Sequence, residues 1–237
     1  MSDGNLTVQR FLAVIKGVCE KTRHPMPPHL TPLAEGHAIP APSSLEEALK
    51  TAGLALDDAQ SACLFANIVN LSIADGRVRD RSLVELAAET LRLERDSARD
   101  VQEALEARFQ SNAFRDDDEW ALFCAVLIAM EGADGEVAKS ETAYLQRFVP
   151  SLEHIEAGNR LLAEKAETLD DQVARLSTRQ KRFLTAHVIG MMLIDGQYEG
   201  TEAELLEKLT DQMSLAQCDQ DRLLKGLYTL YNVSVLG

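Results

Sequence analysis

The stretch that decides the fold is Ala133-Asp134-Gly135-Glu136-Val137-Ala138-Lys139-Ser140-Glu141. It lies between two segments whose apolar residues recur at helical spacing, and an Asp-Gly pair of this kind marks a turn. Two further pairs, Asp75-Gly76 and Asp195-Gly196, lie on either side of it at nearly equal separations along the chain. Such regular spacing indicates an architecture built from a repeated unit.

Apolar residues occupy the same positions relative to each of the three Asp residues. We expect a helix A before each pair, a tight turn, a helix B, and a third helical stretch C over 97–109, 153–176 and 219–231. The sequence therefore predicts an all-α helical bundle of about three repeated units, at about 54–112, 113–172 and 173–237. The positions 11, 7 and 4 before and 3, 11 and 18 after Asp are Leu64, Ile68, Leu71, Val78, Leu86, Leu93; Phe123, Leu127, Met130, Val137, Leu145, Leu152; and Leu184, Val188, Met191, Tyr198, Leu206, Met213.

Residues 1–43 have a different character from the repeat domain at 44–237. Leu6 to Val18 has the spacing of an amphipathic helix, and six of the seven prolines fall between Pro25 and Pro42. Proline at this density favours an extended linker, and the histidines within it are expected to be scattered polar residues. Ser44 followed by Glu47 fits a capping box that opens the first helix of the following domain.

The charge and the apolar runs of the sequence exclude some classes of partner. The 237 residues carry 24 Lys plus Arg against 38 Asp plus Glu, a net charge of −14. This balance argues against nucleic acid as a partner and favours cations or other proteins. The longest apolar run, from Ala121 to Met130, is far shorter than the ~20 residues that a membrane-spanning helix needs. We therefore expect no membrane insertion, and with no basic leader segment we expect a cytoplasmic protein.

The pattern A-D-G-x-V-x-x-x-E in residues 133–141 resembles the repeated signature of the tellurite-resistance TerB-like family. Ala74-Asp75-Gly76-Arg77-Val78, and Asp195-Gly196-Gln197-Tyr198 with Glu202, extend the resemblance over residues 54–237. The resemblance implies a small helical cytoplasmic protein of stress and tellurite responses, in which the turn commonly occurs twice per domain. It also implies that acidic residues of the turns bind a divalent metal.

Carried over residue by residue, the implied ligands are Asp134 with Glu141 and Asp195 with Glu202. In the first copy Asp75 matches, but Ser82 stands where the Glu is expected. Carboxylate oxygens of this kind suit Ca²⁺ or Mg²⁺.

A purely structural interpretation of the turns competes with the metal site. Gly after helix A can adopt the left-handed conformation that ends a helix, and Asp can accept hydrogen bonds from free amides. Glu near the start of helix B then complements the helix dipole.

Three functions follow from these alternatives. The first is a non-catalytic interaction or sensing module in a stress response, with divalent metal at the Asp-Gly turns. The second is a pure helical scaffold whose turns are structural throughout. The third is a metal-assisted hydrolase with paired carboxylates, although we find no catalytic motif in the sequence.

For three other groups of residues a structural role is expected in preference to a functional one. The acids of 116–119 precede an apolar helix and are expected to cap it. His154 and His187 are expected at the edge of the core rather than on zinc. The basic cluster Arg175, Arg179, Lys181 and Arg182 is expected to be a solvated face or an intramolecular counterweight to the acids.

Overall fold

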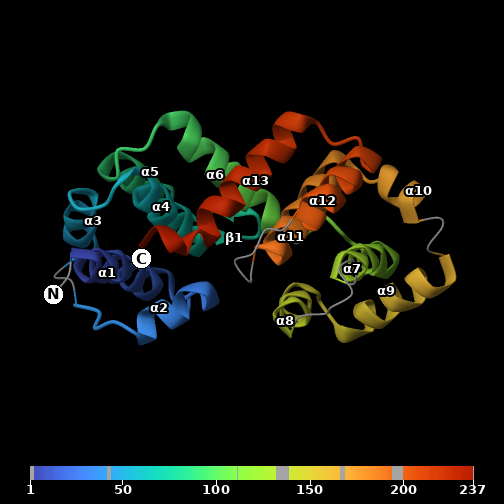
Figure 1. Cartoon of the computed structure of the whole chain (residues 1–237), viewed down its shortest axis with the longest axis horizontal. Coiled ribbons are helices and arrows are strands. Elements are labelled where there is room, and N and C mark those ends of the chain that lie inside the picture. The colour runs from blue at the N-terminus through green and yellow to red at the C-terminus, as the bar shows by residue number, and fades with distance from the viewer. Residues whose placement is uncertain are drawn as a thin grey trace. The chain divides into compact units, whose positions relative to one another are not determined.

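The structure, a computed structural model, describes residues 3–41, 44–110, 112–131, 139–165, 169–193 and 200–236. Within these residues the chain forms thirteen α-helices and a single two-stranded hairpin, so the all-α prediction is confirmed (Figure 1). The chain forms two compact units, which we call unit 1 (Met1–Glu106 with Lys225–Gly237) and unit 2 (Ala107–Leu224).

The threefold order of helix A, helix B and helix C recurs along the described chain. Each helix A has 15 residues and begins at the same position relative to its Asp. The first copy is α4 (Asp58–Ser72), β1 (Ile73–Ala74), β2 (Arg77–Val78), α5 (Arg81–Thr90) and α6 (Arg95–Arg108). The second is α7 (Asp117–Glu131), α8 (Lys139–Phe148), α9 (Leu152–Lys165) and α10 (Leu169–Ala174), and the third is α11 (Thr178–Met192), α12 (Gly200–Gln212) and α13 (Gln217–Tyr231), followed by the 3-10 helix η3 (Val233–Leu236).

Local chemistry explains where these helices begin. Asp57 and Ser177 each accept a hydrogen bond from the amide three residues on, and Gln60 and Gln180 complete the two capping boxes. Ser44 caps α3 (Leu45–Gly53) by accepting from the Glu47 amide, as the sequence predicts. These side chains satisfy amides that the first turn of a helix leaves without a partner.

The predicted apolar face of helix A forms the core. Eight of its nine residues are at most 5 % exposed, and the ninth, Met130, is half-buried. One of the apolar positions predicted after Asp does not lie in the core, because Leu152 is 63 % exposed. It is the first residue of α9, where the helix has not yet reached the surface on which it packs.

The N-terminal segment is more ordered than the sequence predicts. Helix α1 (Asp3–Thr22) buries the expected face, including Phe11, Leu12 and Ile15. The proline-rich segment, expected to be an extended linker, instead contains the 3-10 helix η1 (Pro28–Leu30) and α2 (Thr31–Glu35). Each begins with proline at its first or second position, where a missing amide hydrogen costs nothing, and Leu30 is fully buried in unit 1.

In unit 2, α7 and α9 pack closely through small residues. A Cβ atom on Gly158 of α9 would lie 2.6 Å from Cys124 Cβ and 2.8 Å from the Ala125 amide nitrogen of α7. His154, one turn earlier on α9, contacts Asp117 at the start of α7. The later contact on α9 thus meets the later contact on α7, so the two helices run parallel.

We predict that Gly158→Ala destabilises the protein by about 1–3 kcal/mol, because the new methyl group meets backbone that cannot rotate away. Urea unfolding followed by circular dichroism measures the change. Gly4→Ala is the matched control, because Gly4 also lies in a helix and a Cβ there meets nothing within 4 Å. Equal stability of the Gly158→Ala variant and the wild type would refute the close packing.

Candidate functional site

The first Asp-Gly pair forms the turn of a β-hairpin. β1 and β2 pair antiparallel, with Ile73 opposite Val78 and Ala74 opposite Arg77. Asp75 (φ 53°) and Gly76 (φ 71°) both lie in the left-handed region, as a two-residue type I′ turn requires. The sequence interpretation that places the glycine directly at the end of helix A is therefore wrong for this copy, because α4 ends at Ser72.

The Asp75 carboxylate faces solvent and has an intramolecular partner. Its side chain is 78 % exposed, and Oδ2 lies 2.5 Å from Arg79 Nη2. Ser82, at the position of the expected Glu, donates instead to Asp80 Oδ1 at 2.8 Å. The first copy therefore gives Asp75 a cationic partner and no second carboxylate from the expected position.

Helix B of the first copy is capped by a residue that the sequence analysis did not single out. Asp80 Oδ1 accepts from the Leu83 amide at 3.0 Å, and Oδ2 lies 2.6 Å from Lys21 Nζ of α1. The hydrogen bond from Lys21 is the largest of the interactions that lower the pKa of Asp80. Asp80 thus joins the N-terminal helix to the first repeat.

The other predicted metal ligands lie outside the described residues: Asp134, Asp195 and the side chains of Glu141 and Glu202. Their assignment stays a prediction. Among the residues that are described, no three His, Cys, Asp or Glu side chains are grouped so that they could hold a metal ion.

His187 is a core residue rather than an edge residue. It is 1 % exposed, and its Nε2–H donates to the Arg108 carbonyl at 2.9 Å. Nδ1 must then accept from the Tyr144 hydroxyl, 3.1 Å away. Burial, reinforced by the Arg108 guanidinium, lowers the pKa of His187 to about 3, so the ring is neutral at physiological pH. Phe123, Phe148 and Phe183 surround it with rings.

Asn67 is the counterpart of His187 in unit 1. The two residues occupy the same position relative to their Asp residues, on α4 and α11 respectively. Asn67 Nδ2 donates to the carbonyl of Leu230. Leu230 is the fourteenth residue of α13, just as Arg108 is the fourteenth residue of α6. Asn67 Oδ1 accepts from His29 Nε2 at 2.8 Å, so this linker histidine is held in place rather than scattered. Asn67 was not among the residues predicted from the sequence, although a polar residue in the middle of an apolar helix was the available signal.

The acids before α7 cap that helix, as predicted. Asp116 accepts from the Glu119 amide at 2.9 Å, and Glu119 accepts from the Arg115 amide at 2.6 Å. The Glu119 carboxylate also accepts from Gln180 at 2.7 Å. These acids therefore serve the beginning of a helix, in a close variant of the capping box.

Ser151, His154 and Asp117 line up in the order of a hydrolytic triad. Ser151 Oγ lies 3.0 Å from His154 Nδ1, and His154 Nε2 lies 3.1 Å from Asp117 Oδ1. Asp117 is 99 % exposed, however, whereas the acid of such a triad is buried so that it can orient the imidazole. Ser151 and His154 occupy the N-cap and N3 positions of α9, so the contacts are those of a helix end.

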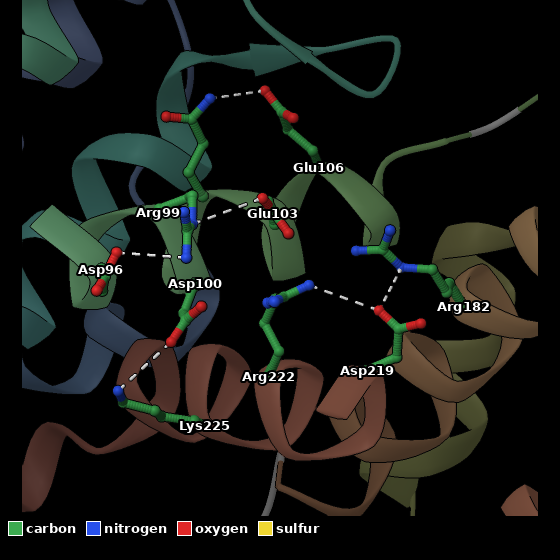
Figure 2. A network of polar contacts seen from close by, with 10 residues as sticks. Asp96, Arg99, Asp100, Glu103, Glu106, Arg182, Asp219, Arg222 and Lys225 are labelled. Carbon is green, nitrogen blue, oxygen red and sulfur yellow. Dashed lines mark hydrogen bonds and ion pairs between the residues drawn. The ribbon is translucent and has the colours of Figure 1, made fainter. Parts of the chain in front are cut away.

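Figure 2 shows ion pairs made by residues of α6, α11 and α13, and each ion pair joins two residues of the same unit. In unit 1, Lys225 Nζ lies 3.6 Å from Asp100 Oδ2. In unit 2, Asp219 Oδ1 lies 3.7 Å from Arg182 and 3.6 Å from Arg222 (Figure 2). Arg179 of the basic cluster binds Gln110 and Asn112. The cluster thus acts in part as the expected intramolecular counterweight to the acids.

Two of the four cysteines lie in the core. Cys63 and Cys124 are buried, and burial raises the pKa of each thiol to about 12. A thiol with so high a pKa carries almost no thiolate near pH 7, so neither residue is an activated nucleophile.

We predict that Gly76→Ala destabilises the protein by about 1 kcal/mol, because φ of 71° is strained for any residue with a Cβ atom. Asp75→Asn should leave thermal stability almost unchanged, since Asn suits the same turn and the lost ion pair is exposed. Thermal unfolding of both variants checks this. The hairpin assignment fails if Asp75→Asn is the more damaging of the two.

We predict that His187 makes the stability of the folded protein fall in acid. Its folded pKa lies below the ordinary value of 6.5, so below pH 6.5 the unfolded chain gains a proton that the folded chain does not. Stability is therefore lost as pH falls, by about 1.4 kcal/mol per pH unit at most. Between pH 7 and pH 5 the wild type should lose about 2 kcal/mol more than His187→Gln. Urea unfolding at both pH values measures the difference, and equal losses would contradict the buried neutral imidazole.

Comparison with protein-family models, curated proteins and solved structures finds no match to this chain. Across the part of the chain that the structure describes, no helix has the length and apolar character needed to cross a membrane.

Proposed function

We propose that this chain is a non-catalytic, TerB-like interaction and sensing module of a cytoplasmic stress response. In this proposal a divalent cation binds at the Asp-Gly turns of unit 2, and other proteins read out the bound state. The tellurite-resistance resemblance supplies the biological setting, and Ca²⁺ and Mg²⁺ are the cations that suit the carboxylates.

One observation carries the proposal: how the three turns are divided between the units. Unit 2 contains the two copies of the sequence motif that keep both acids, Asp134 with Glu141 and Asp195 with Glu202. Two turns in one compact unit match the number that the TerB-like resemblance implies. Unit 1 contains the single copy that lacks the Glu, and there Asp75 pairs with Arg79.

The scaffold alternative has an observation in its favour. The hairpin at Asp75 and Gly76 needs no ligand, because the type I′ turn alone accounts for both residue types. If the turns of unit 2 follow the same logic, the protein is a helical scaffold without a cation site.

Thermal unfolding in Ca²⁺, Mg²⁺, Mn²⁺ or Zn²⁺, against a chelator, separates the two functions. We expect one of these cations to raise the unfolding temperature of the wild type, because a ligand that binds only the folded state stabilises it. At a concentration of about 100 times Kd the gain is about 2.7 kcal/mol. The double variant Asp134→Asn, Asp195→Asn should lose this gain.

Asp75→Asn is the matched control, because it makes the same chemical change in a turn that lacks the second acid. It should keep the full gain. Absence of stabilisation by every cation, or equal loss in Asp75→Asn, would reject the cation site and leave the scaffold.

A further inference from the structure

Unit 2 contains an open pocket of about 300 Å³ between α7, α9, α10 and α12. Its walls are mainly aliphatic, and its polar residues include Asp170, Lys208 and Gln212. A concave apolar site with a few polar groups is the usual form of a small-molecule site, and about 300 Å³ is the lower end of the size range. Aliphatic side chains that contribute to the walls are Val126, Met130, Leu162, Leu169 and Leu205.

The pocket interrupts the apolar face that the repeats otherwise bury. Leu71 and Met191, four residues before their Asp residues, are 5 % and 2 % exposed. Met130 has the same position in α7 but is only half-buried, because it lines the pocket. Ala129 beside it is too small to fill the space. An apolar ligand that covers this aliphatic surface would be stabilised by removing it from water.

The charges around the pocket favour a cation. Unit 2 holds 12 Lys plus Arg and 22 Asp plus Glu, a net charge of −10. Met130 and Leu162 lie in the last turns of α7 and α9, which run parallel, so the negative ends of two helix dipoles lie on the same side of the pocket. Asp170 adds a carboxylate, and among the described residues of the lining Lys208 is the one cation.

From this combination we infer that the pocket binds an alkylammonium group. The short aliphatic chain lies between α7, α9 and α12, and the ammonium lies beside Asp170. This site is independent of the Asp-Gly cation site, and its test is run with a chelator present.

Isothermal titration calorimetry of the full chain with octylammonium, octanol and octanoate tests the inference. We expect octylammonium to bind most tightly, octanol about threefold more weakly, and octanoate more weakly still. Ala129→Leu fills the pocket from an exposed position, so it should abolish binding while leaving the unfolding temperature unchanged. No octylammonium binding, binding that survives Ala129→Leu, or equally tight octanoate binding would overturn the inference.

A pair of matched variants tests the headgroup contact. Asp170→Asn should weaken octylammonium binding about threefold, whereas Asp171→Asn should not, although both acids lie in the first turn of α10. Only Asp170 lines the pocket. Lys208→Gln should strengthen binding by a similar factor, because it removes the like charge. Equal effects of Asp170→Asn and Asp171→Asn would mean that only the overall negative charge attracts the ammonium group, and would overturn its assigned position beside Asp170.

Discussion

Burial of one apolar face of helix A is the constraint on which the fold depends. In α4, α7 and α11 the residues 11 and 7 positions before Asp are fully buried, so each helix A has one orientation in its unit. The other elements follow from that orientation. In the first copy the chain turns away from this face at Asp75 and Gly76, and helices B and C cover apolar surface that helix A leaves exposed.

Polar groups then determine which segments cover helix A. Asn67 and His187 are both fully buried, and each reaches the carbonyl at the fourteenth residue of a helix C. In both cases that helix belongs to another copy, since α4 binds Leu230 of α13 and α11 binds Arg108 of α6. A buried polar group left without its partner would cost about 1–3 kcal/mol, so these bonds select one packing among many apolar alternatives. In α7 the equivalent residue is Val126, and there the copy's own helix C packs close through Gly158.

The candidate site was predictable only in part. The Asp-Gly spacing and the recurring apolar positions located the three helix A segments and the turn at Asp75 and Gly76. The cap at 116–119 followed from acids that precede an apolar helix. The hairpin at Asp75 was not predictable from the turn residues alone, because Gly supplies a positive φ to a helix end and to a type I′ turn equally well. The role of Asp80 depends on Lys21, which lies far away in the sequence, in the N-terminal helix α1.

The sequence by itself determined the all-α class, the register of the three helix A segments and the acidic balance, because helical periodicity and charge are local properties of the chain. Only the tertiary structure decided that the repeats divide into two units, that a helix C can serve another copy, and that His29 and Leu30 anchor the proline-rich segment. It also decided that Met130 lines a pocket while Leu71 and Met191 are buried. These outcomes depend on the volumes and hydrogen-bond partners supplied by distant segments, and no local pattern specifies those.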